Sequence, residues 1–254
     1  MLNKIFRGLA PVFAMVAAAG VSGCDGTISV GDEKGVPLSE LDMAGKTPTE
    51  LVLAGPDNVI VSEGETLDVE VSGDRDAVDA LRFTLDETTL GIMRRKGDWK
   101  GDGKATVRVT MPALEKLVVA GSGTVEAPRL TGSPEVIIAG SGKARTARVE
   151  ADALEVTIAG SGSYEAAGVA KSLDLTIAGS GSARMDGLKV DDAEITIAGS
   201  GDAGFASDGT VEAKIMGSGD VRVAGTARCT ISSMGSGSLH CSPAEAAAEA
   251  APAE

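Results

Sequence analysis

The sequence predicts an all-β protein with a single folded domain, a parallel β-helix (β-solenoid) of about seven rungs. Three observations predict it: the motif AGSG or MGSG occurs seven times, its copies start 18 to 20 residues apart, and apolar residues alternate with polar ones around it. A nearly fixed interval of this length is typical of repeats in which each unit stacks on its neighbours. The copies start at Ala120, Ala139, Ala159, Ala178, Ala198, Met216 and Met234.

The residues around each motif predict two strands, each with one buried face. Two and four positions before the first glycine the residues are almost all apolar, and polar residues such as Thr157 and Thr176 stand between them. This alternation is that of a half-buried strand. Four and six positions after the same glycine the residues are again mostly apolar, as at Tyr164 and Ala166. A second strand is therefore expected to follow each motif.

Each interval thus makes one rung of two or three short strands. At the usual spacing of paired strands, about 4.8 Å, seven rungs would extend about 34 Å. Parallel pairing between neighbouring rungs would satisfy their backbone groups, and the apolar columns would become one continuous core.

The glycine-serine-glycine triplet is predicted to turn the chain at the corner between the strands. Glycine adopts positive φ without strain, and a side chain there would crowd the next rung. The stretch IIAGSGKAR fails the phosphate-loop patterns, because Ile137 and Ala144 stand where the Walker pattern needs a glycine and a hydroxyl, and Arg145 stands where the dinucleotide pattern needs its third glycine. The predicted turn residues are Gly121, Gly123, Gly140, Gly142, Gly160, Gly162, Gly179, Gly181, Gly199, Gly201, Gly217, Gly219, Gly235 and Gly237.

The chain begins with the features of a bacterial export signal. Lys4 and Arg7 precede an apolar run that is shorter than the roughly 20 residues of a membrane-spanning helix. The run ends in Val21-Ser22-Gly23-Cys24, which resembles a bacterial lipobox. That resemblance implies that Cys24 becomes the mature N-terminus and carries the lipid. The alternative is an ordinary secretory signal with a chance cysteine.

Composition divides the chain into four segments. We predict a lipoprotein signal peptide at residues 1–23, a flexible tether at 24–47, the solenoid domain at 48–242 and a disordered Ala/Glu/Pro tail at 243–254. Within the domain, residues 48–112 should form a mixed or antiparallel β cap that hides the open sheet edge, and residues 113–242 the AGSG rungs. The cap begins with ELVLAG, residues 50–55, which looks like a degenerate rung.

The chain is acidic, with 37 Asp and Glu against 23 Lys and Arg and a net charge of −14. Removal of residues 1–23 takes away Lys4 and Arg7 and no acidic residue, so the mature chain carries a net charge of −16. An acidic surface repels phosphate backbones and anionic lipid headgroups. Nucleic acid is therefore not expected as a partner, and the membrane should be reached through the lipid on Cys24.

The succession of segments resembles one bacterial family. The stretches VIVSEGETLDVEVSG and LDETTLGI lead into the junction VRVTMPALEKLVVAGSG, at Val107 to Gly123, and then into the AGSG rungs. Over about residues 48–241 this resembles the family named putative auto-transporter adhesin, head GIN domain. The resemblance implies a secreted or envelope-attached β-helix with no established enzymatic activity and no family catalytic residues to assign.

Few residues offer catalytic chemistry, and the sequence predicts a protein that is not an enzyme. The only histidine, His240, stands near the end of the last rung with no obvious acidic partner in the sequence, which is typical of an exposed polar residue. A polysaccharide-active β-helix enzyme is the alternative, since such enzymes use carboxylates and bound calcium. The fold alone does not confer that activity, and no catalytic residue is assigned.

One column of acidic residues is the sharpest candidate site. Neighbouring carboxylates about 4.8 Å apart are close to the span of two oxygens on opposite sides of a calcium ion, whose bonds are roughly 2.3–2.6 Å. Without a cation each pair repels by about 0.9 kcal/mol in water. Calcium is the one cofactor that the sequence suggests; the alternative, which needs no cofactor, is that the carboxylates point into solvent and discourage aggregation. The column consists of Glu135, Glu155, Asp174, Glu194 and Glu212, each five residues before a triplet glycine.

Cys229 and Cys241 remain once Cys24 is assigned to the lipid. They lie six residues before and six after Gly235 in columns that are otherwise apolar, so both should point inward in the final rung. Outside the cytoplasm two such thiols are expected to oxidise, and the bridge would stabilise the last coil by about 3 kcal/mol. The alternative is two separate buried thiols.

These features predict a non-enzymatic, lipid-anchored β-solenoid of the bacterial cell envelope that acts as a structural, adhesive or interaction module. A periplasmic cation-binding envelope protein is a further candidate. Asp25, directly after Cys24, resembles the signal that retains enterobacterial lipoproteins at the inner membrane. The periplasmic face of the inner or outer membrane is therefore favoured over the cell surface, and the protein or polysaccharide partner is not identified by the sequence.

Overall fold

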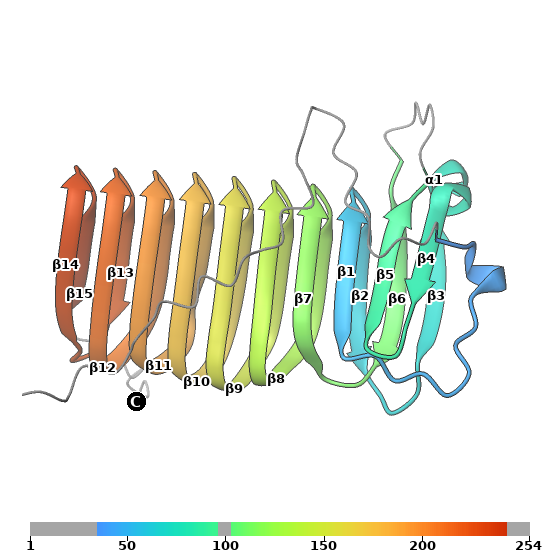
Figure 1. The fold of residues 1–254 in the computed structure, drawn as a ribbon, viewed down its shortest axis with the longest axis horizontal. Helices are drawn as coiled ribbons and strands as arrows, with labels where there is room; N and C mark the ends of the chain where they lie inside the picture. The colour runs from blue at the N-terminus through green and yellow to red at the C-terminus, as the bar shows by residue number, and fades with distance from the viewer. Residues whose placement is uncertain (1–34, 96–102, 243–254) are drawn as a thin grey trace, which may run out of the picture.

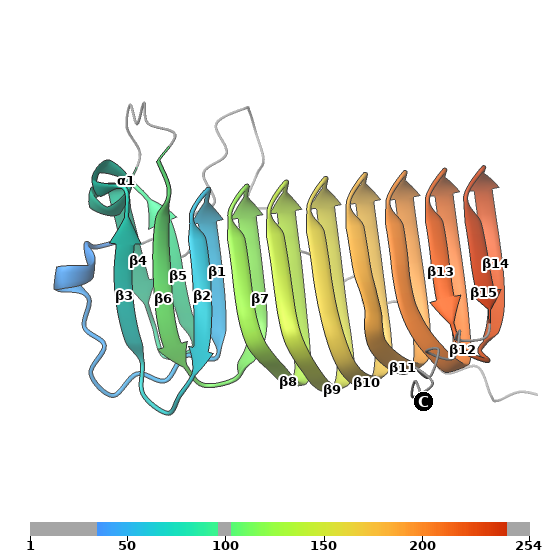
Figure 2. The ribbon, with the colours of Figure 1, turned by 180° about the vertical axis from the view of Figure 1, so that it is seen from behind.

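The computed structural model describes residues 35–95 and 103–242 and shows a coil of β-strands (Figure 1). Fifteen strands belong to one continuous sheet, and this part of the chain also has one short helix, α1 (Arg75–Ala80), and one 3-10 turn, η1 (Leu38–Glu40). The rungs lie side by side along the long axis in both views (Figures 1 and 2). The predicted all-β solenoid of about seven rungs is confirmed.

The strands form two groups along the chain. The N-terminal region contains β1 (Glu50–Gly55), β2 (Asn58–Glu63), β3 (Asp68–Gly73), β4 (Leu81–Leu85), β5 (Thr89–Arg94) and β6 (Ala105–Met111). The repeat region contains β7 (Leu114–Gly121), β8 (Thr124–Gly140), β9 (Lys143–Gly160), β10 (Ser163–Gly179), β11 (Ser182–Gly199), β12 (Asp202–Gly217), β13 (Asp220–Ala224), β14 (Arg228–Gly235) and β15 (Ser238–Ser242).

Each repeat is a flattened loop with strands on opposite sides of the core. At one edge of the loop a glycine triplet reverses the chain, as between β9 and β10. At the other edge the chain bends within a strand, so β8 to β12 are 16 to 18 residues long. The register between rungs shifts near this bend, for example between Ala166 and Gly168. Elsewhere neighbouring rungs pair in parallel and in phase, with Gly160 opposite Gly179.

Alternate side chains of these strands form the core. Val156, Ile158 and Tyr164 are fully buried, and their equivalents in the other complete rungs are buried in the same way. Burial of a large apolar side chain contributes about 1.5–3 kcal/mol, and the contribution recurs in each rung. The buried hydroxyl of Tyr164 donates a 3.1 Å hydrogen bond to Oγ1 of Thr146, which satisfies the polar atom that the tyrosine brings into the core.

The triplets form the corners because only glycine fits there. Gly160 has a φ of +119°, and a Cβ on it would lie 2.5 Å from the carbonyl oxygen of Gly140 in the neighbouring rung. A Cβ on Gly162 would lie 2.5 Å from Cγ2 of Ile138. The backbone N–H of Ser161 donates a 2.9 Å hydrogen bond to the carbonyl of Gly140. The triplet therefore serves both to turn the chain and to let successive corners stack.

The N-terminal region continues the solenoid and then ends it. β1 pairs in parallel with β7 and aligns Gly55 with Gly121, and β2 pairs in parallel with the start of β8, which confirms the predicted degenerate rung. β5 and β6 add another rung beyond β1 and β2, again in parallel. β3 and β4 then pair antiparallel with β6 and β5. The cap contains parallel and antiparallel pairs, as predicted. However, β1 with β2 and β5 with β6 form two further rungs of the coil, and the later strands β5 and β6 lie farther from β7 than β1 and β2 do.

A buried ion pair holds the degenerate corner between β1 and β2. Asp57 is 1% exposed, and its Oδ1 lies 2.5 Å from Nη2 of Arg94 at the end of β5. The same oxygen accepts a 2.8 Å hydrogen bond from the N–H of Ala105, while Nη2 of Arg94 also donates to the carbonyl of Gly103 at 3.1 Å. Asp57 therefore ties the β1–β2 corner to the connection between β5 and β6, a role that the sequence did not reveal.

A disulfide joins the two strands of the last rung. Cys229 in β14 and Cys241 in β15 are bonded, with Cα atoms 6.7 Å apart, which confirms the predicted bridge. Cys24, the predicted signal peptide and the predicted tail at 243–254 lie outside the described residues. Among the residues that the structure does describe, neither helix has the length and apolar character needed to cross a bilayer.

Candidate functional site

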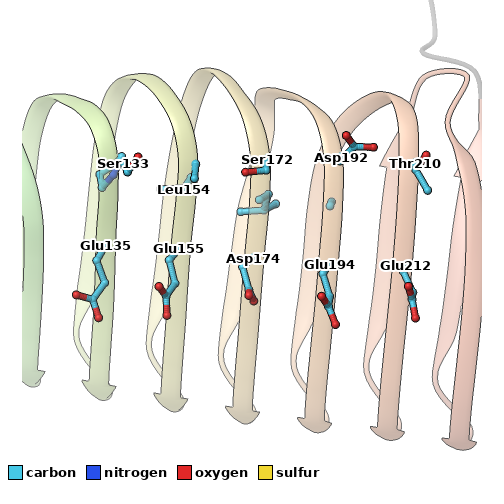
Figure 3. A pocket seen from close by; sticks show the side chains of 14 residues that line it. Ser133, Glu135, Leu154, Glu155, Ser172, Asp174, Asp192, Glu194, Thr210 and Glu212 are labelled. Carbon is cyan, nitrogen blue, oxygen red and sulfur yellow. The ribbon is translucent and has the colours of Figure 1, made fainter. Parts of the chain in front are cut away.

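The five predicted carboxylates form a straight row on the outer face of the coil (Figure 3). The in-phase parallel register places one carboxylate on each of five successive rungs, and their side chains project from the strand segments that precede the triplets. We call this row the carboxylate stripe; it consists of Glu135, Glu155, Asp174, Glu194 and Glu212.

Two lysines neutralise the ends of the carboxylate stripe. Nζ of Lys116, which occupies the stripe position in the preceding rung, lies 2.6 Å from Glu135. At the other end Nζ of Lys214 lies 2.7 Å from Glu194 and 3.8 Å from Glu212. The hydrogen bond to Glu194 is the main cause that raises the pKa of Lys214. The same alignment that revealed the acidic column contains Lys116, whereas Lys214 lies two positions further along its strand and was missed.

The two central carboxylates, Glu155 and Asp174, form no ion pair with a lysine or arginine among the described residues. The pKa of Glu155 is raised, first by desolvation and then by repulsion from Glu135 and Asp174, while Lys116 opposes the shift only from a distance. The pKa of Asp174 is also raised by desolvation and then by Glu194, while Lys214 opposes the shift. Both side chains are exposed on the outer face, so we attribute the desolvation to crowding by the neighbouring rungs. The excess negative charge of the stripe is therefore concentrated on its two middle rungs.

A shallow groove of about 480 Å³ runs beside the stripe across the same five rungs. Its far side consists mainly of small polar and apolar side chains near the bend of each rung, among them Ser133, Ser172, Asp192 and Thr210 (Figure 3). Its long shape follows from the rung spacing, since each rung supplies an equivalent set of lining residues. The groove can accept an extended ligand better than a compact one.

The stripe does not gather its carboxylates around one point. Within residues 35–95 and 103–242, no group of three or more His, Cys, Asp or Glu side chains is arranged to hold a metal ion. A cation at the stripe would therefore be shared by carboxylates of neighbouring rungs. Calcium binding stays a prediction.

His240 has polar neighbours that sequence spacing did not reveal. Its Nε2 lies 2.9 Å from Oγ of Ser238, and the same hydroxyl donates a 2.5 Å hydrogen bond to Oδ1 of Asp220 in the preceding rung. The bond from Ser238 is the main cause that lowers the pKa of Asp220. In a catalytic triad the histidine lies between the serine and the acid and takes the serine proton. Here the serine lies in the middle and donates its hydrogen bond to the carboxylate, so its proton is not directed at the imidazole.

The opposite face of the coil carries charges of alternating sign. Glu126, Arg145, Glu165 and Arg184 stand opposite one another in four successive rungs. Nη1 of Arg184 lies 3.6 Å from the carboxylate of Glu165. This face is close to neutral along its length, so the acidic character of the repeats is displayed on the side of the carboxylate stripe.

Comparison with solved structures finds the same fold in proteins of Parabacteroides and Bacteroides species. A protein described as a putative lipid binding protein from Parabacteroides distasonis is 22% identical with a TM-score of 0.60, covering 78% of this chain and 93% of that chain. A putative adhesin from Bacteroides fragilis is 20% identical with a TM-score of 0.65, covering 77% and 93%. A putative adhesin from Parabacteroides merdae is 20% identical with a TM-score of 0.60, covering 78% and 92%. At these identities the likeness shows the fold alone.

The curated proteins include no match to this chain. One family model matches residues 47–227, which include the degenerate rungs, the corners from Gly121 to Gly219 and the whole carboxylate stripe. The match covers most of the chain and agrees with the resemblance carried by the junction at Val107 to Gly123. The chain belongs to the family described as putative auto-transporter adhesin, head GIN domain.

Proposed function

We propose that the protein is a non-enzymatic, lipid-anchored module of the bacterial cell envelope that acts in structure, adhesion or interaction with a partner. The observation that carries the proposal is the difference between the two faces of the coil, one with the carboxylate stripe and its groove, the other with alternating charges. Backbone pairing in every rung fixes this surface in advance, which lowers the entropic cost of binding. The adhesin-like family and the neighbours described as putative adhesins support an envelope role.

A polysaccharide-active enzyme is the less supported alternative. Such an enzyme needs a general acid and a second carboxylate or a base that face one bound sugar. The stripe carboxylates project side by side from one face instead of from two sides of a bound sugar (Figure 3). The nearby lysines, Lys116 and Lys214, do not line the groove and are already paired with Glu135 and Glu194. The alternating face offers acid–base pairs, but its four alternating residues do not line the groove beside the stripe.

The lipid anchor is tested by the variant Cys24→Ala. We expect the wild-type protein to sediment with membranes and the variant to be released in soluble form, because the acidic surface itself does not favour anionic lipids. Cys229→Ala, which leaves the lipobox intact, is the matched control and should remain in the membrane fraction. A Cys24→Ala protein that stays membrane-bound would contradict lipid anchoring at this residue.

The location is tested by protease treatment of intact cells and of cells whose outer membrane has been opened. The proposal favours the periplasmic face, so we expect the solenoid to be protected on intact cells and degraded after opening. A periplasmic protein of the same cells controls for leakage. Degradation on intact cells would overturn the periplasmic placement and would direct the search for partners to surfaces outside the cell.

Cation binding is a second candidate function because the two middle carboxylates of the stripe form no ion pair among the described residues. We propose that calcium is shared between neighbouring carboxylates at Glu155 and Asp174. Binding to the folded state alone would raise the melting temperature in millimolar calcium. The variant Asp174→Asn should lose most of this rise, whereas Asp152→Asn, outside the stripe, should keep it. A melting temperature of the wild type that does not change with calcium would eliminate this candidate.

A further inference from the structure

The last rung of the solenoid is open on its outer side. β14 pairs with β12 and β15 pairs with β13, both in parallel, and no described residue pairs with the other edge of either strand. At the opposite end the antiparallel strands β3 and β4 are also outermost, but α1 packs against β3, Val36 bridges to Phe83 in β4, and Leu38, Leu41 and Met43 pack against the core. The C-terminal end thus presents two free strand edges, which are strong hydrogen-bonding surfaces for another chain.

The core is also open at this end. Val211, Ala213 and Val221 of the preceding rung are completely buried. Their counterparts are Cys229, Ile231 and Leu239, of which Ile231 is 43% exposed and the other two are half-buried. These apolar side chains have rung neighbours on one side only.

Apolar exposure is concentrated at this end of the molecule. Four large hydrophobic side chains are strongly exposed among the described residues, and three of them, Met216, Ile231 and Met234, belong to the last two repeats. Arg228 is the only formally charged residue in the last rung, residues 228–242, if His240 is neutral. Edge strands that must stay unpaired usually carry several charges or a proline. This edge has neither protection, although the protein as a whole has a net charge of −14.

We propose that the C-terminal end is a docking surface for a second copy of this chain, joined end to end by a two-fold axis. An axis perpendicular to the long axis and normal to the two faces places β14 against β14 of the partner subunit and β15 against its own copy, each antiparallel. Both free edges are satisfied at once, and the open core ends meet. Such a self-complementary contact is the usual way in which homodimers form.

Three observations favour a second copy as the occupant. The stripe side of the coil is acidic and the chain as a whole has a net charge of −14, so two copies approach with less repulsion at this weakly charged end. The disulfide between Cys229 and Cys241 holds both edges in one fixed arrangement, as simultaneous pairing requires. Residues 243–254 consist only of Ala, Glu and Pro, which are poor strand formers and would bring carboxylates to an apolar surface.

The test is the mass of the full chain in density-matched detergent by sedimentation velocity at micromolar concentrations. We expect a dimer for the wild type. The double variant Ile231→Lys and Met234→Lys places four positive charges at the proposed contact and should raise the dissociation constant by about 100-fold. Both positions are exposed, so the single chain should keep its fold, which circular dichroism would check. Val169→Lys, at an equally apolar residue 56% exposed in the middle of the coil, is the matched control and should remain a dimer.

Several results would overturn the proposal. A monomeric wild type, or a dimer that Val169→Lys weakens as much as the double variant does, would show that this end is not the contact. A monomer that dimerises only after removal of residues 243–254 would assign the open edge to the chain's own tail. A dimer that keeps its mass in the double variant would place the contact elsewhere.

Discussion

At the scale of single residues, ionisation and stability are coupled at the centre of the carboxylate stripe. The pKa of Asp174 in the folded protein lies above its ordinary value of 3.8, so the folded state holds this proton more tightly than the unfolded chain does. The free energy of unfolding therefore falls as the pH rises from just below 3.8, the unfolded pKa, through the raised pKa of the folded state. It stays lower by this amount at neutral pH. The same sign applies to Glu155.

The variant Asp174→Asn should remove this cost. We expect it to stabilise the protein by about 0.5 kcal/mol at about pH 7 and to have almost no effect at about pH 3, where the carboxyl is protonated in both states. Thermal unfolding at the two pH values measures the difference. Asp152→Asn, which loses an exposed ion pair with Lys171 outside the stripe, is the control and should not stabilise. Destabilisation by Asp174→Asn at neutral pH would contradict the repulsion argument.

Asp57 is a residue of the opposite kind, buried and fully paired. Its replacement in Asp57→Ala would leave Arg94 and the N–H of Ala105 without this carboxylate at a corner where only about a tenth of the Arg94 side chain is exposed. Loss of one partner of a buried ion pair costs about 3–5 kcal/mol. Denaturant unfolding should show a loss of this size, while Asp152→Ala at an exposed pair should change stability by less than about 1 kcal/mol. Equal effects of the two variants would show that the corner ion pair contributes little.

At the scale of the elements, the corners set how closely the rungs stack. Gly160→Ala combines a φ of +119° with a Cβ only 2.5 Å from the carbonyl oxygen of Gly140, whereas Gly132→Ala has a φ of +77° and nothing within 4 Å. In both variants alanine must adopt a positive φ, which costs at least about 1–2 kcal/mol. Only Gly160→Ala also separates two rungs, so it should cost at least about 2 kcal/mol more in denaturant unfolding. Equal losses in the free energy of unfolding would show that the rungs at this corner can accommodate a Cβ without separating.

The elements also show what the sequence could predict. The rungs, their inward columns, the carboxylate stripe and the Cys229–Cys241 bridge all follow from one period, because parallel in-phase stacking turns equal positions into neighbours. The period says nothing of contacts between unequal positions, such as Lys214 with Glu194. The repeat period also does not extend to the N-terminal region. There β5 and β6 stack on the outer side of β1 and β2, and the ion pair between Asp57 and Arg94 stands at the corner where the repeats have a glycine triplet.

At the scale of the whole molecule, the solenoid is a one-dimensional stack in which each rung contacts only its neighbours. Stability in such a stack is the sum of rung and interface contributions, so a defect at an end stays local while a defect in the middle affects both sides. The described end rungs differ in how they are held. Antiparallel strands cover the N-terminal end, whereas the C-terminal rung is held by one interface and one disulfide.

Removal of that disulfide should therefore loosen one rung and leave the rest intact. In the double variant Cys229→Ser and Cys241→Ser we expect amide hydrogen exchange in β14 and β15 to become up to about 100-fold faster, as loss of about 3 kcal/mol of loop closure implies. Exchange in β9 and β10, several rungs away, should not change. Equal acceleration throughout would show that the coil unfolds as one cooperative unit, and unchanged exchange in β14 would show that β-sheet pairing alone holds the last rung. We expect the change in exchange rate to decrease from the last rung toward the middle of the coil. The last rung pairs with the rest of the sheet only between β14 and β12 and between β15 and β13, so loss of the bridge affects other rungs only through these two strand pairs.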